Sequence, residues 1–403
     1  MRTFFQALVA VTIPSCPEVE QPLTPYREHS RALLRPQFSR DQVADLNLEE
    51  THVQHMFKHL STRSGWTRQI DLSPVFFRLT IDSATEFLFG QSIQSQVPST
   101  AEVGMGNGQF NWNSLADAFD RGTAVLGARA RLSGLYWLIN PSQFKDDCKE
   151  VHRFADYFVN LAIQQTSEPV GEEKSKYVFL RELAKVNKDP IELRSQLLNI
   201  LLAGRDTTAG LLGWTCWNLA RHPSIYNRLR TTIIEAFGTY NNPHQISFSS
   251  LKSCTYLQHV LKETLRLFPS VPLNARQATR DTTLPLGGGP DGTCPVYIKK
   301  GQEIGYSVYV MQRREDLWGK DAAIFNPDRW ADRKMVGWEY LPFNGGPRIC
   351  LGQQFALTEV GYVLTRLIQK FDRMENCDPR DEPIHHYSVT SAPKQVLVRL
   401  HEA

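Results

Sequence analysis

The sequence lacks the features that mark several classes of protein. No apolar stretch approaches the about 18 residues of a membrane-spanning helix, so none is predicted. Basic residues (45 Lys plus Arg) barely outnumber acidic ones (42 Asp plus Glu), and like charges never form a long run. The charge pattern of a nucleic-acid-binding protein is therefore missing. Internal repeats and flexible linkers are also missing, which favours one large folded unit in these 403 residues.

Cysteine is scarce and scattered. The odd number of cysteines and the absence of any CxxC pair argue against a disulfide framework and favour reduced thiols in an intracellular or cytosol-facing protein. The seven cysteines are Cys16, Cys148, Cys216, Cys254, Cys294, Cys350 and Cys377. All except Cys350 are expected to be core or loop thiols.

Long helical patterns fill most of the chain. One at 191–221 is apolar nearly all round, which predicts a central helix in a large core. The helix at 73–90 is expected to use Ser73 as its N-cap and to end at Gly90. The other predicted helices are a pair broken at Pro36 within about 26–62, then 113–138, 142–166, 224–237, 254–267 and one after residue 352.

Residues 271–305 have a different character. β-branched residues and the turn LGGGPDGT indicate a small sheet, and the tail 386–400 is expected to end in a hairpin. The glycines at 287–289 form a hairpin turn in this reading, because a phosphate loop needs a strand before it and a helix after it. The predicted fold class is mainly α, with a large helical part and a small β-rich part.

The stretch FNGGPRICLG, residues 343–352, places Cys350 behind a glycine turn and before a helix. A zinc site would need further Cys or His residues nearby, and none is present. A nucleophile would need a histidine base, which the sequence leaves open. A single thiolate also suits the axial position of a haem iron. Glycines then allow a close turn, the helix N-terminus faces the thiolate, Arg348 reaches a propionate and Phe343 shields the sulfur.

A second polar stretch, AGRDTT at 203–208, interrupts the apolar central helix. Helix packing, with threonine hydroxyls bonded to carbonyls one turn back, would be a sufficient explanation for it. The small residues Ala203 and Gly204 would also leave space beside the helix.

Together these motifs resemble the cytochrome P-450 superfamily of haem-thiolate monooxygenases. FxxGxRxCxG continues as Gln353-Gln354-Phe355-Ala356, and it is accompanied by AGRDTT, by ExxR at Glu263 and Arg266, and by FNPDRW at 325–330. The resemblance implies one haem b (iron protoporphyrin IX) between the central helix and the loop of its ligand, Cys350. The other haem-binding residues that it implies are Arg348, Phe343, Gly346, Arg276, Arg31 and Ala203.

The resemblance also assigns roles beyond haem binding. Thr207 would hold the proton-delivering water beside bound dioxygen, and Asp206 would replenish protons. Glu263, Arg266 and Arg329 would lock the core. In the helix that carries Arg31, the position that usually holds a tryptophan is Arg27.

The branch that the sequence resembles is the fungal alkane- and fatty-acid-hydroxylating group. It implies an iron-dependent oxidoreductase that takes electrons from NADPH through a flavoprotein reductase at the cytosolic face of the endoplasmic reticulum membrane, or in the cytoplasm if the chain is complete without an anchor. Substrates would be long-chain alkanes, fatty acids or compounds of secondary metabolism.

The resemblance covers residues 27–403, and residues 1–26 are an atypical N-terminal segment where the family carries an anchor and its first strands. A truncated or mis-joined gene model is the favoured explanation, with a shortened isoform second. A non-catalytic haem-binding remnant is the alternative function. A reductase-independent isomerase or dehydratase is disfavoured by the presence of both Asp206 and Thr207.

Overall fold

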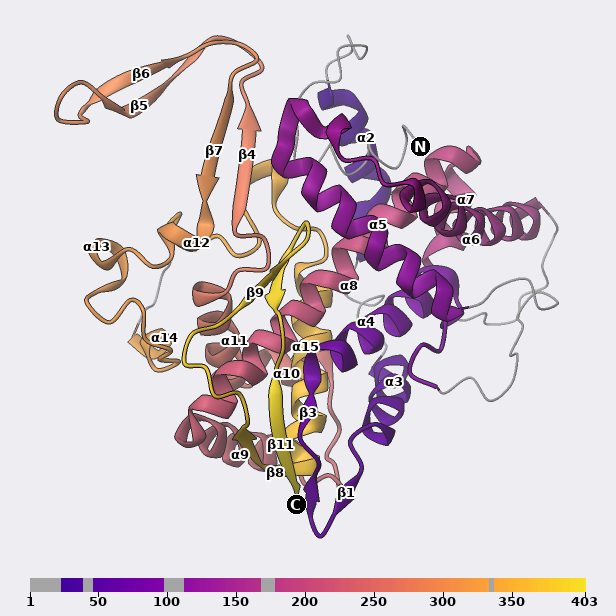
Figure 1. Cartoon of the computed structure of the whole chain (residues 1–403), viewed down its shortest axis with the longest axis vertical. Coiled ribbons are helices and arrows are strands. Elements are labelled where there is room, and N and C mark those ends of the chain that lie inside the picture. Colours follow the sequence, from indigo (N-terminus) through magenta and orange to yellow (C-terminus); the bar gives the residue numbers. More distant parts are fainter. Residues whose placement is uncertain (1–22, 39–45, 98–111, 168–177, 333–336) are drawn as a thin grey trace.

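The computed structural model describes residues 23–38, 46–97, 112–167, 178–332 and 337–403. Helix α8 (Pro190–Arg221) crosses the middle of the molecule (Figure 1). The Asp189 carboxylate caps its start by accepting the N–H groups of Ile191 and Glu192, and Pro190 occupies the first turn, where no donor is needed. The prediction of a long central helix is confirmed.

Helices surround α8 on most sides. The N-terminal half packs against α4 (Leu72–Phe89), α6 (Ser142–Ser167) and α7 (Phe179–Val186). The C-terminal half packs against α9 (Pro223–Phe237), α11 (Thr255–Leu267) and α15 (Gln353–Lys370). The remaining helices of four residues or more are α2 (Leu23–Leu34), η1 (Arg35–Phe38), α3 (Leu46–Lys58), α5 (Trp112–Leu132), η2 (Ser133–Leu138), α10 (Phe248–Ser253), α12 (Val308–Met311), α13 (Glu315–Trp318) and α14 (Arg329–Asp332).

Two apolar cores meet along α8. Residues 193–202 of the helix belong to a core with α4, α5, α6 and α7, and residues 209–220 belong to a second core with α3, α9, α11 and α15. The polar stretch 203–208 lies between them. Apolar packing therefore does not explain the residues in this part of the central helix.

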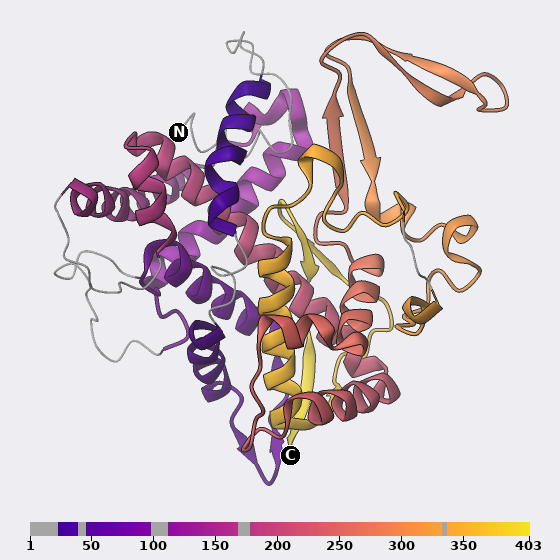
Figure 2. The ribbon, with the colours of Figure 1, turned by 180° about the vertical axis from the view of Figure 1, so that it is seen from behind.

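The β structure is small. Strands β1 (Thr62–Arg63), β2 (Trp66–Thr67), β11 (Leu397–Glu402) and β3 (Ile70–Asp71) follow one another in an antiparallel sheet, with β8 (Phe371–Asn376) also paired to β11. Three two-stranded pairs complete it: β4 (Leu273–Gln277) with β7 (Glu303–Ser307), β5 (Thr282–Gly288) with β6 (Cys294–Ile298), and β9 (His385–Tyr387) with β10 (Ser391–Pro393). The β5–β6 hairpin extends away from the body, as both views show (Figures 1 and 2).

The fold class is confirmed, and so are most predicted helices within a few residues. The predicted cap of α4 is wrong. Asp71 accepts the Ser73 N–H at 3.0 Å, and the Ser73 hydroxyl instead reaches the carbonyl of Pro393. Asp71 is the N-cap because its carboxylate is a stronger hydrogen-bond acceptor than a hydroxyl. Gly90 does end the helix, in the left-handed conformation.

Within the described part of the chain, no helix is long and apolar enough to cross a membrane. Residues 1–22 lie outside the described residues, so the predicted boundary between 26 and 27 stays a prediction.

Candidate functional site

Cys350 lies in a tight turn, residues 343–352, which connects an irregular segment to the start of α15. The Cys350 N–H donates to the Phe343 carbonyl at 2.9 Å and so closes the loop. Asn344 and Gly346 both have φ in the left-handed region, at 64° and 66°. A side chain at Gly345 would place its Cβ 2.6 Å from the Trp338 ring, so glycine is required there. We call residues 343–352 the Cys350 loop.

Cys350 is a free and exposed thiol. Burial by the surrounding protein raises the pKa of this thiol above the ordinary 9.0, against the Gly352 N–H and the Arg31 charge, which lower it. An accessible thiol can bind a metal ion, and coordination would then remove its proton.

Three arginines meet at the same loop. The Arg31 guanidinium of α2 donates to the Ile349 carbonyl at 2.9 Å, and burial together with the charges of Arg276 and Arg31 lowers the pKa of Arg348. Arg276 comes from β4, where its guanidinium lies over the Tyr306 ring. Among the described residues, no carboxylate lies within ion-pair distance of these three cations. Such a cluster is stable only with an anion beside it, and the two carboxylates of a haem fit that requirement.

The polar stretch of α8 also opens onto free space. Ala203 is exposed between two mostly buried stretches of the helix, and an added Cβ on Gly204 would meet no atom within 4 Å apart from its own helix backbone. The Thr207 hydroxyl donates to the Ala203 carbonyl at 2.6 Å. Thr207 therefore makes the intrahelical bond that helix packing alone would explain, and it does so at the edge of an opening.

Next to this opening, Asp206 is buried and paired. Its carboxylate lies 3.2 Å from the Arg205 guanidinium, which also binds Asp120 of α5 and lies over the rings of Phe77 and Phe119. Burial, opposed by Arg205 and assisted by the charge of Asp120, raises the pKa of Asp206 to about 6. Asp120 is 54% exposed, so this chain of charges leads from solvent to the buried carboxyl.

Sequence reasoning missed Asp120 and gave Arg205 no role. Asp120 belongs to no motif, and only the packing of α5 on α8 could have identified it. The structure places the other candidates in two groups. Cys350, Arg348, Phe343 and Gly346 lie in the Cys350 loop with Arg31 and Arg276 beside it. Ala203, Asp206 and Thr207 lie on α8. The side chain of Arg27 lies outside the described residues.

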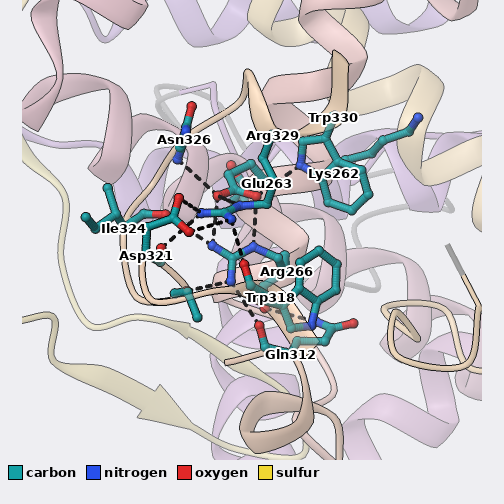
Figure 3. Close-up of polar contacts among 12 residues, drawn as sticks. Lys262, Glu263, Arg266, Gln312, Trp318, Asp321, Ile324, Asn326, Arg329 and Trp330 are labelled. Carbon is teal, nitrogen blue, oxygen red and sulfur yellow. Dashed lines mark hydrogen bonds and ion pairs between the residues drawn. The ribbon is translucent and has the colours of Figure 1, made fainter. Parts of the chain in front are cut away.

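A separate network locks α11 to the irregular segment before the Cys350 loop (Figure 3). Glu263 and Arg266 are both fully buried and form an ion pair at 2.8 Å. The Glu263 carboxylate also accepts the Trp330 indole N–H at 3.0 Å and lies 3.4 Å from Arg329. Arg266 donates further to the carbonyls of Gln312, Ala322 and Ile324. The side chains that the resemblance grouped as a core lock are thus in contact.

Comparisons with known proteins agree on one family. A family model described as Cytochrome P450 matches residues 25–399. Cytochrome P450 monooxygenase g430 of Fusarium sp is 53% identical over 370 residues, which cover 89% of this chain and 64% of that protein. Cytochrome P450 52A13 of Debaryomyces hansenii is 50% identical over 360 residues (88% and 69%), and Cytochrome P450 52A10 of Candida maltosa is 50% identical over 355 residues (86% and 67%). The chain spans about two thirds of the length of these curated relatives.

Proposed function

This chain belongs to the cytochrome P450 family, and on that premise we propose that it is a haem-thiolate monooxygenase that inserts one atom of dioxygen into a C–H bond of an apolar substrate. The observation that carries the proposal is the Cys350 loop, where one exposed thiol lies beside three arginines that have no carboxylate partner among the described residues. Family membership implies the haem cofactor, and these residues fit it.

In this proposal Cys350 binds the iron, and Arg31, Arg276 and Arg348 bind the haem carboxylates. Haem bound through a thiolate supplies electron density that favours cleavage of the O–O bond. Phe343 limits the access of water to the sulfur, and Gly346 allows the loop to turn beneath it. The small residues at 203 and 204 leave space for a diatomic molecule beside α8.

Proton supply falls to α8. The Thr207 hydroxyl already donates to a helix carbonyl, so its oxygen is available to accept a hydrogen bond from a water molecule. Asp206, with its pKa raised to about 6, can hold a proton near neutral pH and release it to that water. Arg205, which is also paired with the solvent-exposed Asp120, holds Asp206 in place, and a water molecule would replace the proton.

The substrate class and the partners follow from the resemblance to the fungal alkane- and fatty-acid-hydroxylating branch. We propose long-chain alkanes or fatty acids as substrates, with secondary metabolites as the nearest other class. Electrons would come from NADPH through a flavoprotein reductase at the cytosolic face of the endoplasmic reticulum membrane.

The function is tested with purified protein in two steps. We expect a strongly red-shifted Soret band when the reduced protein binds carbon monoxide, and hydroxylated products when reductase, NADPH and a panel of alkanes and fatty acids are added. The panel spans roughly C12 to C18, because each methylene adds about 0.8 kcal/mol of transfer free energy and longer chains should bind more tightly. Absence of the band contradicts the haem-thiolate assignment. A normal band with no product from any member contradicts the substrate class alone.

Thr207→Ala and Asp206→Asn are expected to lower the yield of hydroxylated product per NADPH by on the order of 100-fold, since positioned proton transfer contributes at least this much. The wild-type rate should fall as pH rises through about 6, because the protonated fraction of Asp206 falls, and Asp206→Asn should lose this dependence. Product and NADPH are measured together across pH.

Thr215→Ala is the matched control for Thr207. Thr215 makes the same bond one turn back, to the Leu211 carbonyl at 2.7 Å, but it lies in the buried part of α8. It should leave the product yield per NADPH unchanged. An equal loss in both threonine variants would show that the helix bond matters and the proton role does not.

A further inference from the structure

Two buried carboxyl groups outside the proposed site share one hydroxyl. The Ser83 hydroxyl of α4 lies 2.8 Å from the Glu49 carboxyl of α3 and 2.9 Å from the Glu359 carboxyl of α15. Glu49 is 5% exposed, Glu359 is 3% exposed and Ser83 is fully buried. The contact joins three helices in the interior.

The number of protons at this contact is fixed by chemistry. A serine hydroxyl has one proton to donate, and an ionised carboxylate has none. If both carboxyls were ionised, one of the two short contacts would join oxygen atoms with no proton between them. One carboxyl therefore holds a proton. Burial and the charge of Glu49 raise the pKa of Glu359 well above its ordinary value of 4.5, in keeping with this count.

The other charged groups near the contact have their own partners. On the α3–α15 boundary, Glu50 binds Arg366 and accepts the Tyr362 hydroxyl. On the α3–α4 boundary, His52 lies 2.9 Å from Glu86.

Charged groups on the surrounding elements also have partners of their own. Asp82 accepts the backbone N–H groups of Ser95 and Gln96. On the remaining helices packed against α15, Arg230 of α9 donates to the Ile368 carbonyl, Lys252 of α10 lies over Phe248, and Glu263 of α11 is paired with Arg266. On α8, Cys216 is a buried thiol whose pKa burial raises, and Arg205 is paired with Asp206. None of these described groups is a counter-ion for Glu359, so its own proton neutralises this carboxyl.

The contact supports the start of the helix that follows the cysteine ligand. α15 begins at Gln353, directly after the Cys350 loop, and the Ala356 N–H continues the ladder back to the Gly352 carbonyl. Glu359 lies in the second turn of this helix. A change at Glu359 is therefore transmitted to the loop along a short rigid element.

We propose that Glu359 is a positioning residue: one proton, shared with Glu49 across Ser83, fastens the start of α15 to α3 and α4, and its loss at alkaline pH releases the Cys350 loop. The link to the loop rests on the proposed function. The proton-dependent fastening does not, and its test needs no haem.

In Glu359→Gln, an amide N–H that does not titrate takes the place of the carboxyl proton. The introduced amide donates to Ser83, and Ser83 donates to Glu49, at every pH. Between pH 4.5 and the raised pKa of Glu359, the native wild-type protein holds one proton more than the unfolded chain. Its unfolding constant therefore rises by up to tenfold per pH unit in this window, relative to that of Glu359→Gln. Wild type should lose stability as pH rises, and the variant should not share this loss.

The measurement is denaturant unfolding of both proteins from pH 5.5 to 9. Glu49→Gln should remove the same pH dependence of stability. The double variant with both substitutions should show no larger change than either single variant, because only one proton is shared. Glu375→Gln is the matched control, since Glu375 is exposed on β8, and it should follow wild type. Parallel curves for wild type and Glu359→Gln, or an effect of Glu359→Gln without an effect of Glu49→Gln, would overturn the shared proton.

A second measurement tests the link to the loop. Hydrogen exchange of peptides covering residues 351–360 is compared between wild type and Glu359→Gln at each pH, so that intrinsic exchange rates cancel. We expect equal protection at pH 6 and at least tenfold faster exchange in wild type at pH 9. The red-shifted Soret band should also decay faster at pH 9 in wild type. Equal exchange at pH 9 would contradict the release of α15, whether or not the protein binds haem.

Discussion

Replacing Cys350 with alanine is expected to abolish the red-shifted Soret band of the reduced carbon monoxide complex, and with it all oxygenation. The band requires a thiolate on the iron, and three of the other described cysteines are inaccessible to it. Cys148, Cys216 and Cys254 are buried in the apolar cores. Nor does the described part of the chain contain a cluster of His, Cys, Asp and Glu residues that could hold the metal elsewhere. Absorption spectra of the reduced protein with and without carbon monoxide measure the effect.

Cys294→Ala is the control for this experiment. Cys294 is also a free and exposed thiol, but it lies on the β5–β6 hairpin, which extends away from the body (Figure 1). The variant should keep the full band. Circular dichroism of Cys350→Ala should match wild type, because removing an exposed side chain leaves no cavity in the core. A band that survives in Cys350→Ala would show that the iron has another ligand.

Local patterns in the sequence predicted most of the helices and the close turn of the Cys350 loop. The α8 pattern was recognisable because its apolar residues face cores on every side, and its polar interruption stood out for the same reason. The Cys350 loop was recognisable because a close turn before a helix needs particular residues at adjacent positions, such as Gly345 beneath Trp338. Both are features of consecutive residues.

The parts that could not be predicted depend on residues far apart in the chain. Asp120 reaches Arg205 only because α5 packs near α8, and Glu49 meets Glu359 across more than 300 positions. The short strands β1 to β3 were missed because each has two residues and is held by pairing with β11 or with a neighbouring strand. The wrong cap of α4 has the same origin, since the Ser73 hydroxyl is taken by a carbonyl near the C-terminus.

Glu263→Ala is expected to destabilise the fold by about 3–5 kcal/mol, a large part of the roughly 5–15 kcal/mol that a domain has. The substitution leaves the fully buried Arg266 without its carboxylate and removes the acceptor of the Trp330 indole and of the Asn326 N–H. Arg329 keeps Asp321 as a partner, so the cost falls mainly on Arg266. The unfolding free energy from denaturant titration gives the value, with soluble yield as a second readout.

The matched control for this loss is Glu182→Ala. Glu182 and Lys185 of α7 form an ion pair at 2.7 Å with the same three-residue spacing as Glu263 and Arg266, but on the surface. Solvent screens such a pair, so its loss should cost only about 0.5 kcal/mol or less. Burial is then the variable that separates the two results, because an uncompensated charge in the interior cannot recover its hydration. Equal losses in the two variants would show that Glu263 contributes no more than a surface pair, and that the segment before the Cys350 loop is held by other contacts.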